Sequence, residues 1–351
     1  MSHLWGVAEL SGEENSERAT LSEVQASMPE NGNPLLEIDH LSKEFAARDS
    51  IFRRSRRIVH ALRDVSFKIY PETTFGIVGE SGCGKTTLLR CILQMIRPTA
   101  GRVAFDGVDL VKLPSSELRI KRRDLQMVFQ NPFNSLNPRL SVLAIVSEPL
   151  RTHTKMSHGE IHDRILDLLE QVGLERDHLY RYPHEFSGGQ LQRIAIARAL
   201  SSNPKFICLD EPTSALDVSV QAQIITLLQN LQREMKLTYL FVSHNLSLVN
   251  HISDQIAVMY LGRIVEIADV KSLFENPLHP YTKALVSATP SLKADSRKDR
   301  IRIEGEIPDA SNPPSGCYFH PRCPYAKDLC FVKYPQMTKI DKMHFVACHL
   351  I

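Results

Sequence analysis

The chain has 351 residues, of which 43% are hydrophobic and 23% are charged, and its formal net charge is +2. That length allows a large core and more than one domain, and a charge so close to zero gives no general argument for nucleic-acid binding. No apolar run approaches the roughly 20 residues that cross a bilayer, and the N-terminus has no basic start followed by an apolar stretch. We therefore expect a protein that stays on the side of the membrane where it is made.

The first part of the chain combines a polar tail with β-type runs. Residues 1–34 are rich in Ser, Glu, Asn and Gly, so we expect a disordered or loosely attached tail. From Leu35, runs such as LLEIDHL and VSFKI predict an N-terminal antiparallel β subdomain, which leads to the strand TTFGIVG. Residues 50–59, SIFRRSRRIV, interleave arginines with apolar residues. This segment is either a solvated loop or a contact with anionic lipid headgroups or a membrane partner.

The middle of the chain alternates between helix and strand patterns. GKTTLLRCILQMI indicates a helix, and residues 131–201 carry helical patterns without strong strand candidates. KFICLD, LTYLFVS and QIAVMY are then typical of buried strands. This order predicts an α/β fold with a mainly parallel sheet, helices on both faces and an inserted helical subdomain at about 131–201. Proline becomes frequent after about Lys271, so we expect a small separate appendage over residues 271–351.

Five short segments follow one another along these elements. They are GESGCGKT from Gly79 to Thr86, Gln130 after an apolar strand, FSGGQ from Phe186 to Gln190, FICLDEPTSALD from Phe206 to Asp217, and His244. A GxxxxGK[ST] string alone is weak evidence, because a chain of this length contains one by chance about one time in a hundred. FSGGQ alone is also typical of a glycine turn that caps a helix. The five in this order predict a split ATP site that one copy of the chain cannot complete.

The first segment suits a triphosphate. Gly79, Gly82 and Gly84 permit a close turn in which backbone N–H groups surround the phosphates, and the helix that begins there adds its positive end. Lys85 then reaches the β- and γ-phosphates. Phe45 is expected to stack on the adenine, although a core phenylalanine near a strand end is also common. The predicted nucleotide-binding residues are Phe45, Gly79, Glu80, Ser81, Gly82, Cys83, Gly84, Lys85, Thr86 and Thr87.

The later segments supply metal ligands and catalytic groups. We expect the Thr86 hydroxyl and Asp210 to hold Mg²⁺, and Gln130 to sense the metal and the attacking water. Glu211 is placed to polarise that water, and the alternative is a surface carboxylate at a strand end. His244 is expected to contact the γ-phosphate, whereas a lone histidine is more often structural. The predicted catalytic residues are therefore Glu211, His244 and Gln130.

Together these segments resemble the nucleotide-binding subunit of an ATP-binding cassette (ABC) transporter, over about Leu35 to Ile267. The resemblance implies one ABC ATPase domain over residues 35–270 that uses ATP and Mg²⁺. In that family two subunits sandwich two ATPs head to tail, and the FSGGQ segment of each closes the site of the other. Phe186 stands where the family usually has leucine and leaves the donor residues intact. The residues implied to meet the partner's ATP are Ser187, Gly188, Gly189, Gln190 and Asp217.

Four longer segments narrow the resemblance to the oligopeptide and dipeptide permease branch: LQMVFQNPFNSLNPR, RYPHEFSGGQ, NPLHPYTKAL and GCYFHPRCPYA. The intact FSGGQ and the NPFNSLNPR run resemble the second ATPase chain of such pairs. The resemblance implies a peripheral subunit at the cytoplasmic face of the inner (cell) membrane that powers import of di- or oligopeptides. Its implied partners are a second homologous ATPase, two transmembrane permease subunits and an external solute-binding protein, with no nucleic acid.

Two kinds of alternative stay open. The same transporter branch also moves nickel, glutathione and short sugars, so the solute does not follow from the resemblance. A non-transport ABC ATPase of translation or DNA repair belongs to a different class. The single phosphate loop argues against a translation factor, and the lack of a long coiled-coil or zinc-hook insert argues against a DNA-repair protein.

Four of the seven cysteines lie in the appendage, at Cys317, Cys323, Cys330 and Cys348. The proline-rich segment of about 35 residues that holds them is too short to build much core, and it would gain order from a covalent or metal cross-link. Disulfides are typical of oxidising compartments, and the CxxC pairs typical of structural zinc are missing. Four thiolates without a compact zinc pattern suit a [4Fe–4S] cluster, which related peptide-permease ATPases with this cysteine set hold. Zinc, with His320 or His349 as a substitute ligand, and free thiols remain the alternatives.

Overall fold

The computed structural model describes residues 32–48, 56–289 and 301–351. Most of the predicted N-terminal tail, residues 1–31, lies outside the described residues, and so does most of the arginine-rich segment 50–59. Within the described part, none of the helices combines the length and the apolar character needed to span a bilayer.

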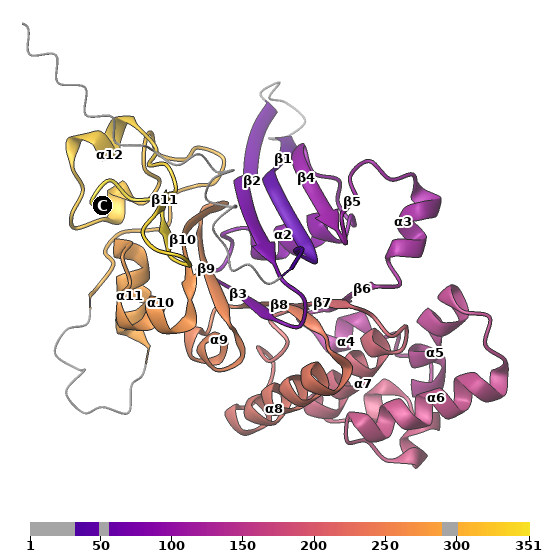
Figure 1. Ribbon diagram of the computed structural model, residues 1–351. Helices are drawn as coiled ribbons and strands as arrows, with labels where there is room; N and C mark the ends of the chain where they lie inside the picture. The colour runs from indigo at the N-terminus through magenta and orange to yellow at the C-terminus, as the bar shows by residue number, and fades with distance from the viewer. Residues whose placement is uncertain (1–31, 49–55, 290–300) are drawn as a thin grey trace, which may run out of the picture.

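A four-stranded antiparallel sheet forms the N-terminal β subdomain, as the sequence predicts (Figure 1). Its strand order is β2-β1-β4-β5. Along β1, Leu36 and Ile38 are fully buried while the alternate residues Glu37 and Asp39 are polar, which is the period-two pattern of a sheet with one face on the core. The strands are β1 (Leu36–Arg48), β2 (Arg56–Ile69), β4 (Ala100–Phe105) and β5 (Val108–Asp109).

The second sheet has eight strands in the order β11-β12-β10-β9-β3-β8-β7-β6. The five neighbouring strands β9, β3, β8, β7 and β6 are parallel to one another, which confirms the mainly parallel α/β sheet. These are β3 (Thr74–Val78), β6 (Leu125–Val128), β7 (Phe206–Asp210), β8 (Thr238–Ser243) and β9 (Gln255–Tyr260). The antiparallel strands are β10 (Arg263–Asp269), β11 (Thr338–Lys339) and β12 (Phe345–Val346).

Helices cover both faces of this sheet because its strands are apolar on both sides. In β7, Ile207 and Leu209 pack into one core with the helices α7 (Gly188–Leu200), α8 (Val218–Met235) and α9 (Leu246–Ile252). The alternate residues Phe206 and Cys208 pack into a second core with α2 (Lys85–Ile92) and the antiparallel sheet. Alternation along one strand therefore builds two apolar layers.

Between β6 and β7 the chain is helical, which confirms the inserted helical subdomain. The elements are α4 (Pro132–Ser135), α5 (Val142–His153), α6 (His158–Gln171), the 3₁₀ turns Arg176–Tyr180 and Pro183–Glu185, and α7. Ser157 begins α6 with a capping box in which its hydroxyl accepts from the Glu160 N–H. Another short helix, α3 (Ser115–Lys121), precedes β6.

The appendage, residues 271–351, returns to the main sheet. It contains most of α10 (Val270–Glu275), then α11 (Pro280–Ala288), the turn η4 (His320–Arg322) and α12 (Asp328–Val332). Its last strand, β12, pairs with β10 through Glu266 and Val346, and Phe345 is buried in the core beneath. Figure 1 shows the C-terminal end of the chain beside β10 and β11. The appendage is thus less separate than its proline content suggests, because it extends the sheet edge.

Candidate nucleotide site

The segment Gly79–Thr86 joins the buried strand β3 to α2, and we call it the phosphate loop. Its turn needs glycine at two positions for different reasons. Gly84 has φ 109°, a left-handed value that side chains disfavour. At Gly79 an added Cβ would lie 2.2 Å from the Met259 carbonyl oxygen. The loop therefore presses against β9 in a shape that larger residues cannot adopt.

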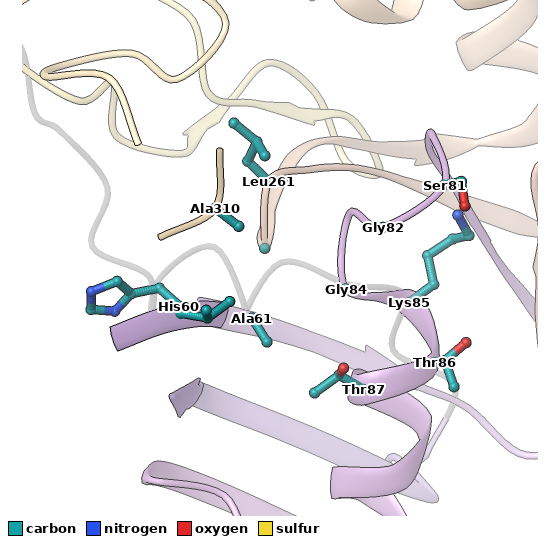
Figure 2. Close-up of a pocket in the computed structure, with 12 residues that line it drawn as sticks. His60, Ala61, Ser81, Gly82, Gly84, Lys85, Thr86, Thr87, Leu261 and Ala310 are labelled. Carbon is teal, nitrogen blue, oxygen red and sulfur yellow. The ribbon is translucent and has the colours of Figure 1, made fainter. Parts of the chain in front are cut away.

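Lys85 is buried at the start of α2, and its ammonium points back into the phosphate loop (Figure 2). Its Nζ donates to the carbonyl oxygens of Gly79 at 2.7 Å and Glu80 at 3.0 Å. A third contact reaches the Cys83 sulfur at 3.8 Å. Sulfur is a weak acceptor, so a phosphate oxygen can take its place while the two carbonyls hold the lysine to the loop. This geometry is what a loop needs if it is to present a fixed positive charge to a triphosphate.

A pocket lies over the phosphate loop (Figure 2). Six of its residues were predicted from the sequence: Ser81, Gly82, Gly84, Lys85, Thr86 and Thr87. Six others carry no motif that reveals them in the sequence: Val59, His60, Ala61, Leu261, Gly262 and Ala310. They come from β2, from the turn between β9 and β10, and from the appendage.

Phe45 lies beside this pocket without being one of its lining residues. It pairs directly with Val59 across the β1–β2 ladder, and directly paired residues project to the same face of a sheet. Its side chain is 37% exposed, and the Lys43 ammonium lies 5.0 Å from the ring centroid. Stacking of Phe45 on adenine stays a prediction.

Thr86 and Asp210 meet at the other end of the loop. The Thr86 hydroxyl donates to Asp210 Oδ1 at 3.2 Å. Burial raises the pKa of Asp210, and the Thr86 hydrogen bond opposes that rise. A buried carboxylate facing a hydroxyl is an all-oxygen donor pair, which fits the hard cation Mg²⁺. These two residues would hold the metal that the sequence predicts.

The three predicted catalytic residues come together at one oxygen atom. Glu211 Oε2 accepts a hydrogen bond from Gln130 Nε2 at 2.8 Å and lies 3.1 Å from His244 Nδ1. Glu211 has φ 45°, an unusual value for a residue other than glycine, and its N–H donates to the Val242 oxygen at 2.9 Å. Residues from the ends of β6, β7 and β8 therefore converge, because parallel strands end at the same edge of the sheet.

The FSGGQ segment leads into α7. Ser187 is exposed, and its hydroxyl accepts from the Gln190 N–H while the Gln190 side chain accepts from the Ser187 N–H. Gly189 has no room for a side chain, because an added Cβ would lie 2.7 Å from Val220 Cγ1. Among the described residues, none of this segment lines the pocket over the phosphate loop.

Asp217, and Phe186 within this segment, have structural contacts of their own. Asp217 caps α8, where its Oδ1 accepts from the Val220 N–H at 3.0 Å and the Ser219 hydroxyl at 2.6 Å, and the Ser219 bond lowers the pKa of Asp217. Phe186 is buried against the ring of His178, with ring centroids 5.2 Å apart. Phe186 is therefore a core residue, and the roles of Ser187 and Asp217 toward a partner stay predictions.

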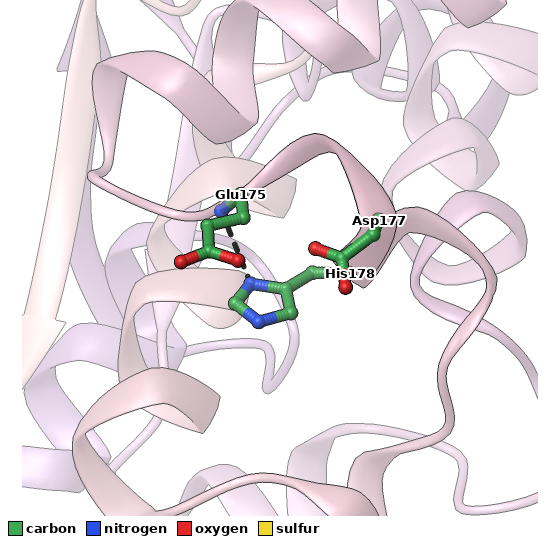
Figure 3. A group of neighbouring side chains, drawn as sticks. All are labelled: Glu175, Asp177 and His178. Carbon is green, nitrogen blue, oxygen red and sulfur yellow. Dashed lines mark hydrogen bonds between the residues drawn. The ribbon is translucent and has the colours of Figure 1, made fainter.

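The ligand atoms of Glu175, Asp177 and His178 lie within 4.8 Å of one another (Figure 3). No motif in the sequence points to this group. His178 is buried, and its Nδ1 accepts from the Glu175 N–H at 3.1 Å. Asp177 forms an ion pair with Arg181. These contacts explain the group as the cap of a 3₁₀ turn that supports Phe186.

The four appendage cysteines are brought close to one another. Cys317 donates its N–H to the Cys330 carbonyl at 2.8 Å. Burial raises the pKa of Cys317 to about 11, and the thiols of Cys330, Cys348 and Cys323 add to that rise. Among the His, Cys, Asp and Glu side chains of the described residues, only Glu175, Asp177 and His178 form a group of three whose ligand atoms lie within 4.8 Å of one another. No three of the four cysteine sulfurs are therefore that close.

Comparison with known proteins places the chain in a family. Residues 62–214 match the family described as ABC transporter, and residues 265–330 match the oligopeptide/dipeptide transporter C-terminal region. The oligopeptide transport ATP-binding protein AppF of Bacillus subtilis (strain 168) is 48% identical over 323 residues, which are 91% of this chain and 98% of that protein. The chain therefore belongs to the ATP-binding ATPase subunits of ABC transporters.

Within that class, other relatives carry similar names. The di/tripeptide transport ATP-binding protein DppF of Pseudomonas aeruginosa (strain UCBPP-PA14) is 46% identical over 309 residues, 88% of this chain and 95% of its own length. Among solved structures, the dimeric ATP-binding cassette MJ0796 bound to ADP and Pi is similar with a TM-score of 0.60 and 32% identity, over 67% of this chain and 98% of that one. This likeness confirms the cassette fold.

Proposed function

We propose that this chain is the ATP-hydrolysing subunit of an importer of di- or oligopeptides. The observation that carries the proposal is the meeting of Gln130, Glu211 and His244 beside a phosphate loop. The match of residues 265–330 to the oligopeptide/dipeptide transporter C-terminal region supports the solute class. AppF and DppF, which are named as peptide transport proteins, align along nearly their whole length.

The residues divide the work of hydrolysis. Lys85 and the backbone N–H groups of the phosphate loop bind and orient the phosphates. Mg²⁺, when bound by Thr86 and Asp210, neutralises charge that develops on the phosphate oxygens. Glu211 accepts a proton from the attacking water as a general base, while Gln130 and His244 hold its carboxylate oxygen in place.

The second half of the site comes from a partner ATPase in this proposal. Ser187 is exposed, and no residue of the FSGGQ segment lines the described pocket, so in this proposal a neighbour supplies the groups that close the pocket. The dimeric state of the cassette MJ0796 supports such pairing. The resemblance to the second chain of permease pairs favours a homologous but different partner. Ser187 and Gly189, at the positive end of α7, would then meet the partner's γ-phosphate.

The permease subunits are expected to contact the helical subdomain at the cytoplasmic face of the membrane. Phe133 in α4 is 56% exposed, and Leu140 after it is 39% exposed. Large apolar side chains in water are typical of protein contacts. A segment near Phe133 to Arg139 is our candidate for the contact with cytoplasmic helices of the permease, through which closure of the ATPase pair reaches the membrane.

Peptide uptake by cells tests the function. Deleting the chain should abolish uptake of a labelled dipeptide, because no ATP-driven closure remains. The native chain should restore it, whereas Lys85→Ala should not, because the phosphates lose their fixed positive charge. Parallel uptake of labelled glutathione and nickel is the control for other solutes of this branch. If the deletion strain takes up the dipeptide normally but loses uptake of glutathione or nickel, the solute of the transporter would be glutathione or nickel and not a peptide.

We further propose that the four appendage cysteines hold a [4Fe–4S] cluster. The Cys330 sulfur accepts the Lys327 N–H at 3.5 Å. Burial raises the pKa of Cys317, Cys323 and Cys348, and the backbone at Phe319, Tyr325 and Leu350 opposes that rise. Backbone hydrogen bonds to sulfur stabilise bound thiolates and tune the cluster. A zinc ion with bonds of about 2.3 Å would hold its thiolates about 3.8 Å apart. No three of the four cysteine sulfurs lie within 4.8 Å of one another, which supports a cluster in which each thiolate binds a different iron.

Protein purified without oxygen should therefore be brown, with a broad absorbance near about 400 nm and about four irons per chain. Cys323→Ser should bleach it, because one ligand is lost. Cys91→Ser, which changes a buried cysteine of α2 outside the appendage, is the control and should keep the colour. Colourless protein with one zinc per chain would decide for zinc, and protein without either metal would leave four free thiols.

A further inference from the structure

The appendage holds the phosphate loop at Glu80 in two ways. The Glu80 N–H donates to the Tyr281 hydroxyl of α11 at 3.0 Å. Its carboxylate forms a bidentate ion pair with Arg322, with Nη1 to Oε2 at 2.7 Å and Nη2 to Oε1 at 3.0 Å. The Arg322 side chain is only 7% exposed. A planar guanidinium that pairs with both carboxylate oxygens fixes orientation as well as charge.

Arg322 is itself fixed to the cysteine-bearing turn. It immediately precedes Cys323, and its N–H donates to the Phe319 oxygen at 3.0 Å. The Phe319 ring packs on Tyr281, with centroids 5.4 Å apart, and on Tyr260, with centroids 5.3 Å apart. The hydrogen bonds to the Glu80 carboxylate raise the pKa of Arg322. The guanidinium also contacts this aromatic cluster, because its Nη1 donates to the Tyr260 hydroxyl at 3.4 Å.

Glu80 in turn positions the lysine that meets the triphosphate. Its carbonyl oxygen accepts from Lys85 Nζ at 3.0 Å. Glu80 thus contacts Arg322 through its side chain, Tyr281 through its N–H and Lys85 through its carbonyl oxygen. We propose that Arg322 is a positioning residue for ATP binding, through which the folded appendage sets the shape of the phosphate loop. This inference rests on the proposed ATPase function and adds the appendage to the control of its affinity.

A second contact of the appendage reaches the same pocket independently. The Ala310 oxygen accepts from the His60 N–H of β2 at 3.4 Å. Ala310 also lines the pocket, across from the phosphate loop in Figure 2. The appendage therefore lines the nucleotide pocket at Ala310 and contacts the phosphate loop at Glu80.

Binding of Mg²⁺–ATP to the full chain, measured by titration calorimetry well below the unfolding temperature, tests the proposal. Arg322→Gln and Glu80→Gln should each weaken binding about tenfold, within the usual range of coupling between sites. The double variant Glu80→Gln/Arg322→Gln should bind no more weakly than either single variant, because both changes remove one interaction. Arg302→Gln, at an exposed arginine of the appendage, is the matched control and should bind like the native chain.

The two single variants distinguish a positioning role of the Glu80–Arg322 pair from a simple effect of charge. If the pair acted only through charge, Arg322→Gln would weaken ATP binding and Glu80→Gln would strengthen it, since each leaves one charge unpaired near the phosphates. Opposite shifts would therefore overturn the proposal, as would unchanged affinity in folded variants or losses that multiply in the double variant. Should Arg322→Gln fail to fold, Glu80→Gln and Arg322→Lys break the same bidentate geometry. Failure of the native chain to bind ATP would instead contradict the proposed function.

Discussion

Glu211→Gln is expected to keep ATP binding and to lower ATP turnover about 100- to 1,000-fold, the usual scale for removing a positioned base. The exchange is nearly isosteric, and the glutamine oxygen can still accept the hydrogen bond that Gln130 donates to Glu211. The charge that draws a proton from the attacking water is lost. In the proposed pair, hydrolysis reopens the closed state, so the closed ATP-bound dimer should accumulate. Phosphate release and gel filtration with ATP, both with the partner chain present, measure the two effects.

Glu234→Gln provides the matched control. Glu234 is an exposed residue of α8, and the substitution makes the same change in charge away from the site. It should leave phosphate release unchanged. Near-normal turnover by Glu211→Gln with the partner present would reject the role of Glu211 as general base, because the geometry around Gln130 and His244 would then act without it.

Ser187→Asp is expected to lower the ATPase rate of the paired complex about 100-fold or more, the scale for losing a donor to developing charge. Aspartate caps a helix about as well as serine, so α7 should keep its start and the chain its fold. In the proposed pair, the new carboxylate would face the γ-phosphate bound by the partner, where we expect the serine to supply a donor. The loss should therefore appear at the partner's site. Single-turnover hydrolysis with ATP bound at that site alone measures it.

Ser157→Asp is the matched control, because Ser157 begins α6 with the same kind of capping box. It should leave the ATPase rate unchanged. The purified native chain should also be a weak ATPase by itself and gain activity with its partner. A monomer that hydrolyses ATP at full rate, in linear proportion to its own concentration, would contradict the split site. So would a fully active complex that contains Ser187→Asp.

The sequence by itself determined the cassette fold and the separate parts of the site. The buried runs FICLD and LTYLFVS predict parallel strands, and both form as β7 and β8. Parallel strands end at one edge, so residues placed just after them must converge, and Gln130, Glu211 and His244 do. The glycine spacing from Gly79 to Thr86 likewise predicts the phosphate loop. These features follow from local spacing, because a phosphate loop or a buried strand imposes its residue pattern on neighbouring positions.

Only the tertiary structure decided what surrounds that site. Arg322 lies 242 positions from Glu80 in the sequence, and neither residue carries a pattern that points to the other. The same holds for Ala310 in the pocket and for the pairing of β12 with β10. The proline-rich appendage looks separate in the sequence because composition records local backbone preference and not distant contacts. The physical reason is that such contacts form between surfaces created by folding, which no local spacing encodes.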